Sequence, residues 1–534
     1  MAFLEDNHLL EDEQNGFRKK RACIDHIHTV STIIRNRIQE NKSTFTCFID
    51  FQKAFDFIDR ELLLFRLLKM GINGYFYSAI QSIYKAPVAC VKLNEHYTSW
   101  FPTPSGVKQG DSLSPTLFAI FINDLAKEIK QLGVGIICGE TTVSLLLYAD
   151  DLIFMADNEY DLQKMLTCAD QWCKKWRLSI NPKKTEIMEF RKAGKKRSTY
   201  QFNFGSNKLQ FTDKYKYLGL IFDEHMSFLH GTSMLADSAS RALGGVIGKT
   251  KILRYMGHST YTQLYQSCVC PILDYCSGVW GFRHFNKSVG VHNRAIRYFL
   301  GVHKFAPIAA VNGDMGWIPC EVRWKINVVN LWNRMLYLPE DRMASRIFSW
   351  DISIGGFWAQ EMSDLLQDHG LGHLYIHKQR VDVGRFKELA MMKYTAKWLE
   401  DIHAKPKLRT YCQFKTEYEC EKYVGYDLSK SQRSLCAQFR SGILPLHVET
   451  GRYTGTELDQ RLCEYCELGE IEDETHFLLY CPFYHDLRKT LFDKVHVDMS
   501  LDSDWVKYLF DNHMFAISNF IHNAWSRRKS ATYA

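Results

Sequence analysis

The alternation of apolar and polar positions predicts a short β-hairpin at residues 143–156. Two apolar, β-prone runs flank Tyr148, Ala149, Asp150 and Asp151, a pattern typical of a strand, a tight turn and a second strand. Burial of two ionised carboxylates is unfavourable without a neighbouring cation, and this stretch supplies none. We therefore expect the acids at an exposed tip that holds a divalent cation. The alternative is an Asp-Asp turn favoured by backbone chemistry alone.

A second carboxylate stands at the end of another apolar run. Residues 44–51 have the pattern of a buried strand, and Asp50 lies near its end. Asp50 could cap the following turn, or it could be the second arm of a metal site with Asp150. Asp59 is predicted to N-cap the next helix. The apolar positions of that helix are Leu62, Leu63, Leu67 and Leu68.

Helical spacing predicts three further helices around these strands. The first has its apolar face on Ile24, Ile27, Ile34 and Ile38. The second starts from an N-cap at Ser114, with Pro115 in the first helical position and Gly133 at its end. Its stripe is Leu117, Phe118, Phe121, Leu125, Ile129 and Leu132. The third has its face on Leu162, Met165, Leu166, Ala169, Trp172 and Trp176.

The remaining local patterns complete a small sheet. Residues 178–180 alternate as a strand, a turn follows at Asn181 and Pro182, and Lys183 and Lys184 then lie near the strand ends. Residues 214–222 resemble one more strand around Gly219. The order of elements predicts an α+β fold, a split βαβ sheet with helices on one face. In such a sheet, residue 50 and residues 150–151 can lie side by side.

Two loops next to these elements have open interpretations. The cluster at residues 18–21 is basic and precedes a helix, so it could meet phosphates or remain a solvated loop. The loop at residues 100–110 contains Gln109 beside Gly110, which would let the backbone approach a ligand closely. The alternative for that loop is a simple helix entry.

The length and composition of the chain limit the number of domains, the kind of binding partner and the state of the cysteines. A chain of 534 residues suggests about three domains. The net charge of +7 is mild, but residues 183–197 concentrate it. No secretory signal or membrane-spanning run is apparent, so the 16 cysteines are expected to be thiols in a reducing compartment. Residues 229–410 are helical and aromatic in pattern, with basic residues between; most of these are expected to be core or a solvated rim.

A metal site is predicted near the C-terminus. Cys463, Cys466, His476 and Cys481 follow the spacing C-x2-C-x9-H-x4-C. Three thiolates and one imidazole suit tetrahedral zinc, and His485 is a spare candidate. The alternative is a set of buried free cysteines. The acidic residues between the ligands favour a structural clip over a phosphate-binding surface.

The motifs together resemble those of the reverse transcriptases of non-LTR (LINE-type) retrotransposons. F-I-D-F-Q-K-A-F-D at 48–56 resembles motif A, S-G-V-K-Q-G-D-S-L-S-P-T-L-F at 105–118 motif B, and Y-A-D-D at 148–151 motif C. L-S-I-N-P-K-K-T-E at 178–186 resembles motif D, and K-Y-L-G at 216–219 motif E. Q-N-G-F-R at 14–18 resembles the stretch ahead of motif A. The resemblance runs from Gln14 to Phe222 and extends more loosely to Cys481.

The resemblance implies a right-hand polymerase palm, a helical thumb or connector and a C-terminal zinc knuckle. The implied segments are residual fingers at 1–44, palm at 45–228, thumb or connector at 229–410 and a C-terminal knuckle region at 411–534. Asp50, Asp150 and Asp151 would form the catalytic triad on Mg²⁺ or Mn²⁺. The other implied roles are Phe55 as a steric gate against the ribose 2′-hydroxyl, Gln109 and Gly110 against the template and nascent pair, Lys184 near the triphosphate, Leu218 and Gly219 at the primer end, and Arg18 in the fingers.

The implied activity is RNA-directed DNA synthesis, with an RNA template, a DNA primer or target and deoxynucleoside triphosphates as partners. The implied location is nuclear and cytoplasmic, in a ribonucleoprotein. Relatives carry more finger sequence ahead of the Q-N-G-F-R stretch, so we expect an N-terminally truncated element product. The rival hypothesis is a catalytically inactive, transposon-derived protein that still binds nucleic acid.

Overall fold

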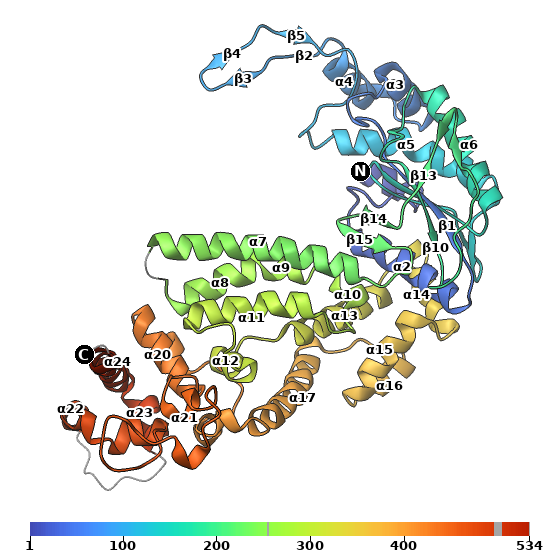
Figure 1. Ribbon diagram of the computed structural model, residues 1–534. Coiled ribbons are helices and arrows are strands. Elements are labelled where there is room, and N and C mark those ends of the chain that lie inside the picture. The colour runs from blue at the N-terminus through green and yellow to red at the C-terminus, as the bar shows by residue number, and fades with distance from the viewer. Residues whose placement is uncertain (254–255, 496–504, 533–534) are drawn as a thin grey trace. The chain divides into compact units, whose positions relative to one another are not determined.

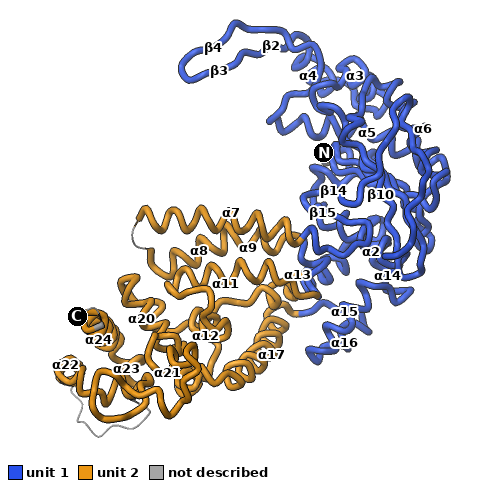
Figure 2. The backbone as a smooth tube through the Cα atoms, viewed as in Figure 1, with its two compact units in different colours: residues 1–231, 276–282, 328–381 blue, residues 232–275, 283–327, 382–534 orange. Residues whose placement is uncertain are grey.

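The computed structural model describes residues 1–253, 256–495 and 505–532. The chain packs into two compact units (Figure 2). Unit 1 contains residues 1–231, 276–282 and 328–381, and unit 2 contains residues 232–275, 283–327 and 382–534. This division cuts across the four consecutive segments expected from the sequence, because two later segments pack within unit 1.

A five-stranded sheet lies at the centre of unit 1 (Figure 1). Its strands are β1 (Thr44–Ile49), β8 (Leu145–Tyr148), β9 (Asp151–Ala156), β10 (Glu186–Phe190) and β13 (Gln210–Phe211). They lie in the order β13-β10-β1-β9-β8. β1 pairs antiparallel with both β9 and β10, and only β13 joins in parallel. The predicted split βαβ sheet and the hairpin of β8 and β9 are therefore confirmed.

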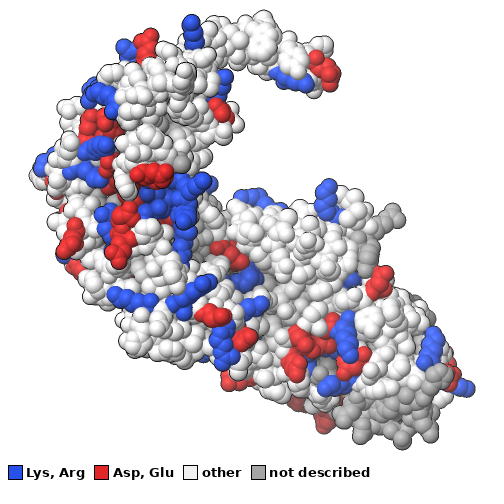
Figure 3. All heavy atoms as spheres, turned by 180° about the vertical axis from the view of Figure 1, so that it is seen from behind, with Lys and Arg blue, Asp and Glu red and all other residues white. Residues whose placement is uncertain are grey.

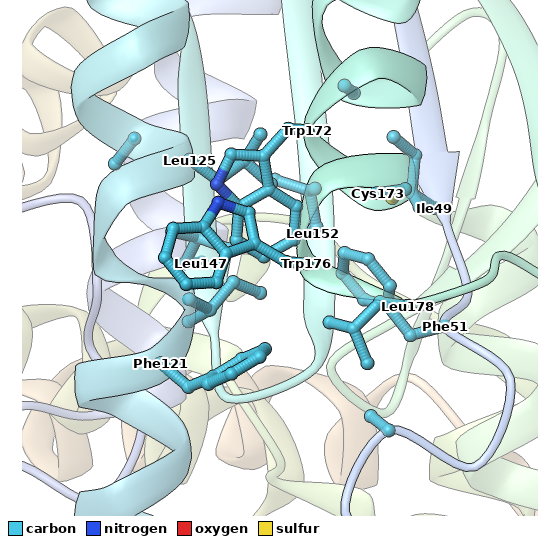
Figure 4. Packing of buried hydrophobic residues seen from close by; sticks show 14 of the residues in the cluster. Ile49, Phe51, Phe121, Leu125, Leu147, Leu152, Trp172, Cys173, Trp176 and Leu178 are labelled. Carbon is cyan, nitrogen blue, oxygen red and sulfur yellow. The ribbon is translucent and has the colours of Figure 1, made fainter. Parts of the chain in front are cut away.

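Two helices cover one face of this sheet, α5 (Ser114–Lys130) and α6 (Glu159–Trp176). Phe121 of α5 and Trp172 and Trp176 of α6 pack over Leu147 and Leu152 of the hairpin strands (Figure 4). All six residues of β1 are buried, which requires cover on both of its faces. The sheet is thus held by a continuous apolar core on this side.

The other face of β1 is covered by a second hairpin, β14 (Lys214–Tyr217) and β15 (Leu220–Asp223). The ring of Tyr215 stacks on Phe48 of β1 with 4.1 Å between centroids. The prediction of one strand at residues 214–222 was wrong. Leu218 and Gly219 have positive φ values of 44° and 84°, so they reverse the chain in the middle of that run.

Most residues of helix α2 (Cys23–Gln39) are buried in unit 1. It packs against α10 (Ser277–Trp280), α14 (Met343–Ser353) and α15 (Phe357–Asp368). Asn36 donates to Asp351 Oδ1 at 2.6 Å. These contacts explain why residues 276–282 and 328–381 belong to unit 1.

The remaining elements up to residue 212 are short. The helices are α1 (Ala2–Asp6), α3 (Arg60–Lys69) and α4 (Gly74–Tyr84). The ribbons are β2 (Val88–Ala89), β3 (Lys92–Leu93), β4 (His96–Tyr97), β5 (Phe101–Pro102), β6 (Ile136–Cys138), β7 (Thr141–Val143), β11 (Asn203–Phe204) and β12 (Asn207–Lys208).

The described residues from 229 to 410 are helical, as expected, and the described residues after 410 also form helices. The other helices are α7 (Leu229–Leu253), α8 (His258–Cys268), α9 (Cys270–Leu273), α11 (Asn286–Leu300), α12 (Ile308–Met315), α13 (Cys320–Leu336), α16 (Gly372–Ile376), α17 (Val383–His403), α18 (Tyr411–Phe414), α19 (Lys422–Gly425), α20 (Lys430–Arg440), α21 (His447–Thr450), α22 (His485–Val495), α23 (Trp505–Asn512) and α24 (Met514–Thr532). Among these and the other described helices, none has the length and apolar character that a bilayer crossing needs.

Local predictions succeeded in part. Asp59 does cap α3, since its carboxylate accepts from the backbone nitrogens of Glu61 and Leu62. Ser114 is not the N-cap of α5: that position is Leu113, whose N–H donates to the Asp111 side chain. The predicted strand at 178–180 is reduced to a single bridge between Phe51 and Ile180.

Candidate active site

Strand pairing brings the three predicted carboxylates to one end of the sheet. Tyr148 pairs with Asp151 across the hairpin, so Ala149 and Asp150 form its turn. On the other edge of β9, Leu152 pairs with Ile49 of β1. Continuing that antiparallel register by one residue sets Asp50 opposite Asp151. Directly opposed residues on one face have Cβ atoms about 5 Å apart.

The electrostatics agree with this proximity. Asp150 and Asp151 are exposed, yet neighbouring atoms partly desolvate them. This burial raises the pKa of Asp151 to about 6, and the charges of Asp150 and Asp50 contribute. Burial and the charge of Asp50 also raise the pKa of Asp150. Mutually repelling carboxylates at an accessible edge are a donor set that suits a hard divalent cation such as Mg²⁺.

Asp50 is fixed through its backbone. Its N–H donates to Thr185 Oγ1 at 3.3 Å, and its carbonyl accepts from Asn181 N at 2.7 Å. These bonds hold the turn at residues 181–185 against the end of β1. Lys184 Nζ consequently lies 3.8 Å from Asp50 Oδ2, so the predicted ammonium group stands beside the carboxylates.

The hairpin of β14 and β15 also borders the carboxylates. Burial raises the pKa of Tyr215, and the charges of Asp151 and Asp50 raise it further, which locates this phenol near both acids. Leu218 and Gly219 form the turn of the same hairpin. Sequence reasoning missed Tyr215 as a site neighbour. The Lys-Tyr-Lys-Tyr alternation at 214–217 was the available signal, since it puts both tyrosines on one face.

Phe55 and the loop before α5 are locked together. The Phe55 ring stacks on Phe118 of α5 with 4.6 Å between centroids, and its carbonyl accepts from Val107 N at 2.8 Å. Gln109 Nε2 donates to Asp56 Oδ1 at 2.8 Å. Gly110 has a φ of 83° and open space where a Cβ would be. Gln109 and Gly110 are therefore exposed beside Asp56, in the segment that follows β1.

The substrate-binding role predicted for Arg18 is not supported. Its side chain is buried and forms a bidentate ion pair with Glu5, at 2.7 and 2.6 Å. It also donates to the carbonyls of Glu11 and Gln14. The guanidinium donates its hydrogen bonds to Glu5, Glu11 and Gln14, so Arg18 stabilises the packing of the N-terminal segment, residues 5–14. The neighbouring Gln14, which carried no prediction, is fully buried against the carboxylate hairpin instead.

Charged side chains of both signs occur on the face drawn in Figure 3, and one larger group of Lys and Arg side chains is continuous there. Figure 3 shows Lys and Arg side chains mixed with Asp and Glu across the drawn face of the described residues. This pattern matches the modest net charge of +7. Contacts with a polyanion would therefore come from local groups of cations such as Lys183 and Lys184.

Comparison with known proteins identifies the segment that carries these residues. The family model "Reverse transcriptase (RNA-dependent DNA polymerase)" matches residues 2–222. Residues 2–222 belong to the reverse transcriptase family. The segment contains Asp50, Asp150 and Asp151 together with the loops around them, so the predicted palm-type fold with helices is confirmed. Relatives from mobile elements confirm the resemblance to non-LTR retrotransposon enzymes.

Curated relatives of this reverse transcriptase segment come from mobile elements. The RNA-directed DNA polymerase from mobile element jockey of Drosophila funebris is 25% identical over 297 residues, 54% of this chain and 32% of the relative. The probable RNA-directed DNA polymerase from transposon BS of Drosophila melanogaster is 25% identical over 304 residues, 55% and 33% of the two chains. The chain thus spans about a third of the length of these relatives.

Two further similarities are at lower sequence identity. The Pol polyprotein of a type-1 R2 element from Nasonia vitripennis is 23% identical over 225 residues, 41% of this chain and 22% of the relative. Among solved structures, apo telomerase from Candida tropicalis aligns over 75% of this chain and 59% of its own, with 13% identity and a TM-score of 0.35. A TM-score this low does not establish a common overall arrangement.

A second candidate site lies in unit 2, outside the reverse transcriptase segment. One ligand atom from each of Cys463, Cys466, His476 and Cys481 lies within 4.8 Å of the others. Cys463 N donates to Glu470 O, and Leu462 bridges Ile471, so a tight ribbon presents the first two cysteines. His485, the spare candidate, is not a member of this group.

The histidine of this group is oriented by a carboxylate. Glu470 Oε2 lies 3.0 Å from His476 Nδ1 and Cys466 Sγ lies 3.4 Å from Nε2. Burial opposes the shift, but hydrogen bonds with Cys463 and Glu470 raise the pKa of His476 to about 9. A carboxylate on one ring nitrogen is the usual way in which proteins aim the other at a metal.

Replacing Asp151 by Asn should stabilise the metal-free protein. The carboxyl pKa is about 6 in the folded chain against a model-peptide value of 3.8, so ionisation disfavours the folded state. After allowance for solvent screening, we expect a gain of about 0.5–1 kcal/mol in the free energy of unfolding at pH 7.5. The gain should be full above pH 6 and should vanish below pH 4, where the carboxyl is protonated in both states.

Urea denaturation in a metal chelator at pH 7.5 and pH 4 measures this difference. Asp341→Asn, at an exposed carboxylate outside the cluster, is the control and should change little. An equal gain from both variants, or a gain that persists at low pH, would contradict the conclusion that ionisation of Asp151 destabilises the folded protein.

Proposed function

We propose that this protein is an RNA-directed DNA polymerase of a non-LTR retrotransposon, which extends a DNA primer along an RNA template. The observation that carries the proposal is the pairing of Ile49 with Leu152 inside the reverse transcriptase segment. Through this pairing, Asp50 meets Asp150 and Asp151 from a part of the chain 100 residues away. The proposal includes a ribonucleoprotein, nuclear and cytoplasmic, formed with the template RNA.

The proposed reaction is an in-line displacement at phosphorus. The primer 3′-hydroxyl oxygen attacks the α-phosphorus of the incoming nucleotide, a P–O bond forms, and the bond to pyrophosphate breaks. Asp50, Asp150 and Asp151 would hold Mg²⁺ or Mn²⁺ ions, which would supply charge stabilisation for the attacking and leaving oxygens. Asp50 and Asp150 are the proposed principal ligands, and Asp151 contributes less to metal binding.

Other residues are proposed to position the substrates. Lys184, beside Asp50, would approach the triphosphate as a point charge. The stacked Phe55 ring would stand against the ribose 2′-position and exclude ribonucleotides. Gln109 and Gly110 would lie against the template and the nascent pair, where exposed backbone allows close approach.

The hairpin turn at Leu218 and Gly219 is proposed to support the primer end. Its neighbour Tyr215 lies close enough to Asp50 and Asp151 for their charges to raise its pKa. A primer terminus at the carboxylates would therefore lie next to this hairpin. RNA, DNA and deoxynucleoside triphosphates are accordingly the proposed partners.

We also propose one structural zinc ion in unit 2, held by Cys463, Cys466, His476 and Cys481. Three sulfur atoms and one nitrogen fill four coordination positions and leave none for a substrate, which is the arrangement of a structural site. The Glu470 contact with His476 supports this proposal, because it leaves Nε2 facing Cys466.

Primer extension tests the polymerase. The purified chain, with a DNA primer annealed to RNA and Mg²⁺ or Mn²⁺, should extend the primer. Asp50→Asn and Asp150→Asn should reduce primer extension to background, because each removes a principal metal ligand. Asp151→Asn should retain more primer extension, because Asp151 contributes less to metal binding. All variants should keep salt-sensitive RNA binding. Retained RNA binding without extension by the unsubstituted chain would favour the inactive nucleic-acid-binding protein.

Phe55→Val should relax discrimination against ribonucleotides. A smaller side chain leaves room for a 2′-hydroxyl, so we expect the ratio of ribonucleotide to deoxynucleotide incorporation to rise roughly tenfold to a hundredfold. Single-nucleotide incorporation kinetics measure this ratio. Phe57→Val is the matched control, since Phe57 is 47% exposed nearby. Equal ratios in both variants would argue against a gate at residue 55.

Metal analysis tests the zinc site. Freshly purified, reduced protein should contain about one zinc per chain, and Cys466→Ser should lower this content because it removes a thiolate ligand. Cys420→Ser, at an exposed cysteine outside the group, should keep the full amount. Zinc-free protein with unchanged thermal stability would count against the site.

A further inference from the structure

The free edge of the carboxylate hairpin is covered by residues 13–15, called the strap here. Leu147 N donates to Glu13 O at 2.9 Å, and Asn15 N donates to Leu147 O at 2.8 Å. Gln14 thereby forms a parallel bridge with Leu147 on the outer side of β8. The strap continues the sheet by one short strand beside the turn that carries Asp150.

The Gln14 side chain bonds to the backbone of that turn. Its Oε1 accepts from Ala149 N at 3.0 Å and from Gly16 N at 2.8 Å. Its Nε2 faces Ala149 O at 3.5 Å. The side chain is 0% exposed, so water does not compete for these bonds. Both backbone polar groups of Ala149 thus face one amide.

Ala149 is held in an unfavourable conformation. Its φ is +58°, a left-handed value that residues with a Cβ seldom adopt. Such a conformation persists where surrounding contacts over-determine it. The two bonds from Gln14 provide that restraint at the residue immediately before Asp150 and Asp151.

Gly16 makes the close approach possible. A Cβ at this position would lie 2.3 Å from Ala149 N and 3.0 Å from Ala149 Cα. The strap backbone therefore packs directly on the turn backbone, and no larger residue fits there. Glycine is needed at residue 16 because a Cβ would clash with Ala149, and not because the backbone there needs the conformational freedom of glycine.

We propose that Gln14 is a positioning residue for the metal-binding carboxylates, with Gly16 as the contact that lets it reach the turn. By holding Ala149 in its left-handed conformation, Gln14 sets the direction in which Asp150 and Asp151 leave the turn. Asp50 is held separately, by Thr185 and Asn181. The hydrogen bonds between Gln14 and Ala149 are called the clamp here. Loss of the clamp therefore changes the distance of Asp150 and Asp151 from Asp50. This inference rests on the proposed function.

Direct Mn²⁺ binding tests the clamp independently of catalysis. Gln14→Met keeps the length of the side chain and removes both polar atoms. We expect about tenfold weaker Mn²⁺ binding, measured by electron paramagnetic resonance of the free ion, which corresponds to about 1.4 kcal/mol. The concentration of Mg²⁺ for half-maximal extension should rise by the same factor. The dissociation constant for RNA should stay unchanged.

Two companion variants separate positioning from a general loss of structure. Asn15→Ala removes a strap side chain that bonds to Arg21 and not to the turn, so Mn²⁺ affinity should stay at the unsubstituted value. Ala149→Gly should restore much of the affinity in the Gln14→Met background, because glycine adopts positive φ without restraint. If Gln14→Met fails to fold, Gln14→Asn gives the same comparison with a side chain one methylene too short.

The outcomes are distinct. Unchanged Mn²⁺ affinity in Gln14→Met, or an equal loss in Asn15→Ala, would overturn the clamp. Absence of extension by the unsubstituted chain would overturn the polymerase, while the Mn²⁺ measurement would still decide the clamp. If Mn²⁺ binding were the same in Asp150→Asn as in the unsubstituted chain, both the proposed polymerase and the proposed role of Gln14 would be overturned.

Discussion

Strand β1 holds the candidate active site together against the repulsion of its own charges. Both edges of β1 are paired, with β9 and with β10, and all six of its residues are buried. A slip of one residue would turn every side chain to the opposite face and carry Asp50 away from Asp151. Packing on the two faces therefore fixes the register. The same packing keeps together carboxylates whose pKa values rise because burial, and then the charges of the neighbouring carboxylates, disfavour ionisation.

The segments around this strand fix the site through the backbone rather than through charged side chains. Thr185 and Asn181 hold the end of β1, and the strap holds the turn between β8 and β9. This leaves the carboxylate oxygens themselves available to a cation. Preorganisation of this kind suits a reaction that depends on positioning and charge stabilisation.

The two proposed metal sites differ in the chemistry of their donors. Asp50, Asp150 and Asp151 offer oxygen atoms at an exposed edge, which suits hard cations that also bind phosphate. Cys463, Cys466, His476 and Cys481 offer sulfur and nitrogen at close quarters, which suits zinc without open positions. The carboxylate site leaves room for a substrate. The proposed zinc site has no open position, so a zinc ion there would only stabilise the local fold.

The sequence by itself determined the elements whose signals are local. The apolar runs predicted β1 and the hairpin of β8 and β9, Asp59 was correctly predicted as a cap, and the cysteine and histidine spacing predicted a group that the structure brings together. The order of motifs also gave the family. Each of these signals depends on residues close in the chain, where periodicity, spacing and turn chemistry are sufficient.

Only the tertiary structure decided the contacts between distant segments. Arg18 lies in a basic cluster that could have bound phosphates, but its side chain is buried and forms an ion pair with Glu5. Gln14 forms a hydrogen bond with Ala149, which is 135 positions away in the chain. The hairpin at residues 214–223 depends on two positive φ values that a β-prone run did not reveal. Such features arise from which strands become neighbours in the sheet, and sheet order is a property of the whole packed core rather than of any local stretch.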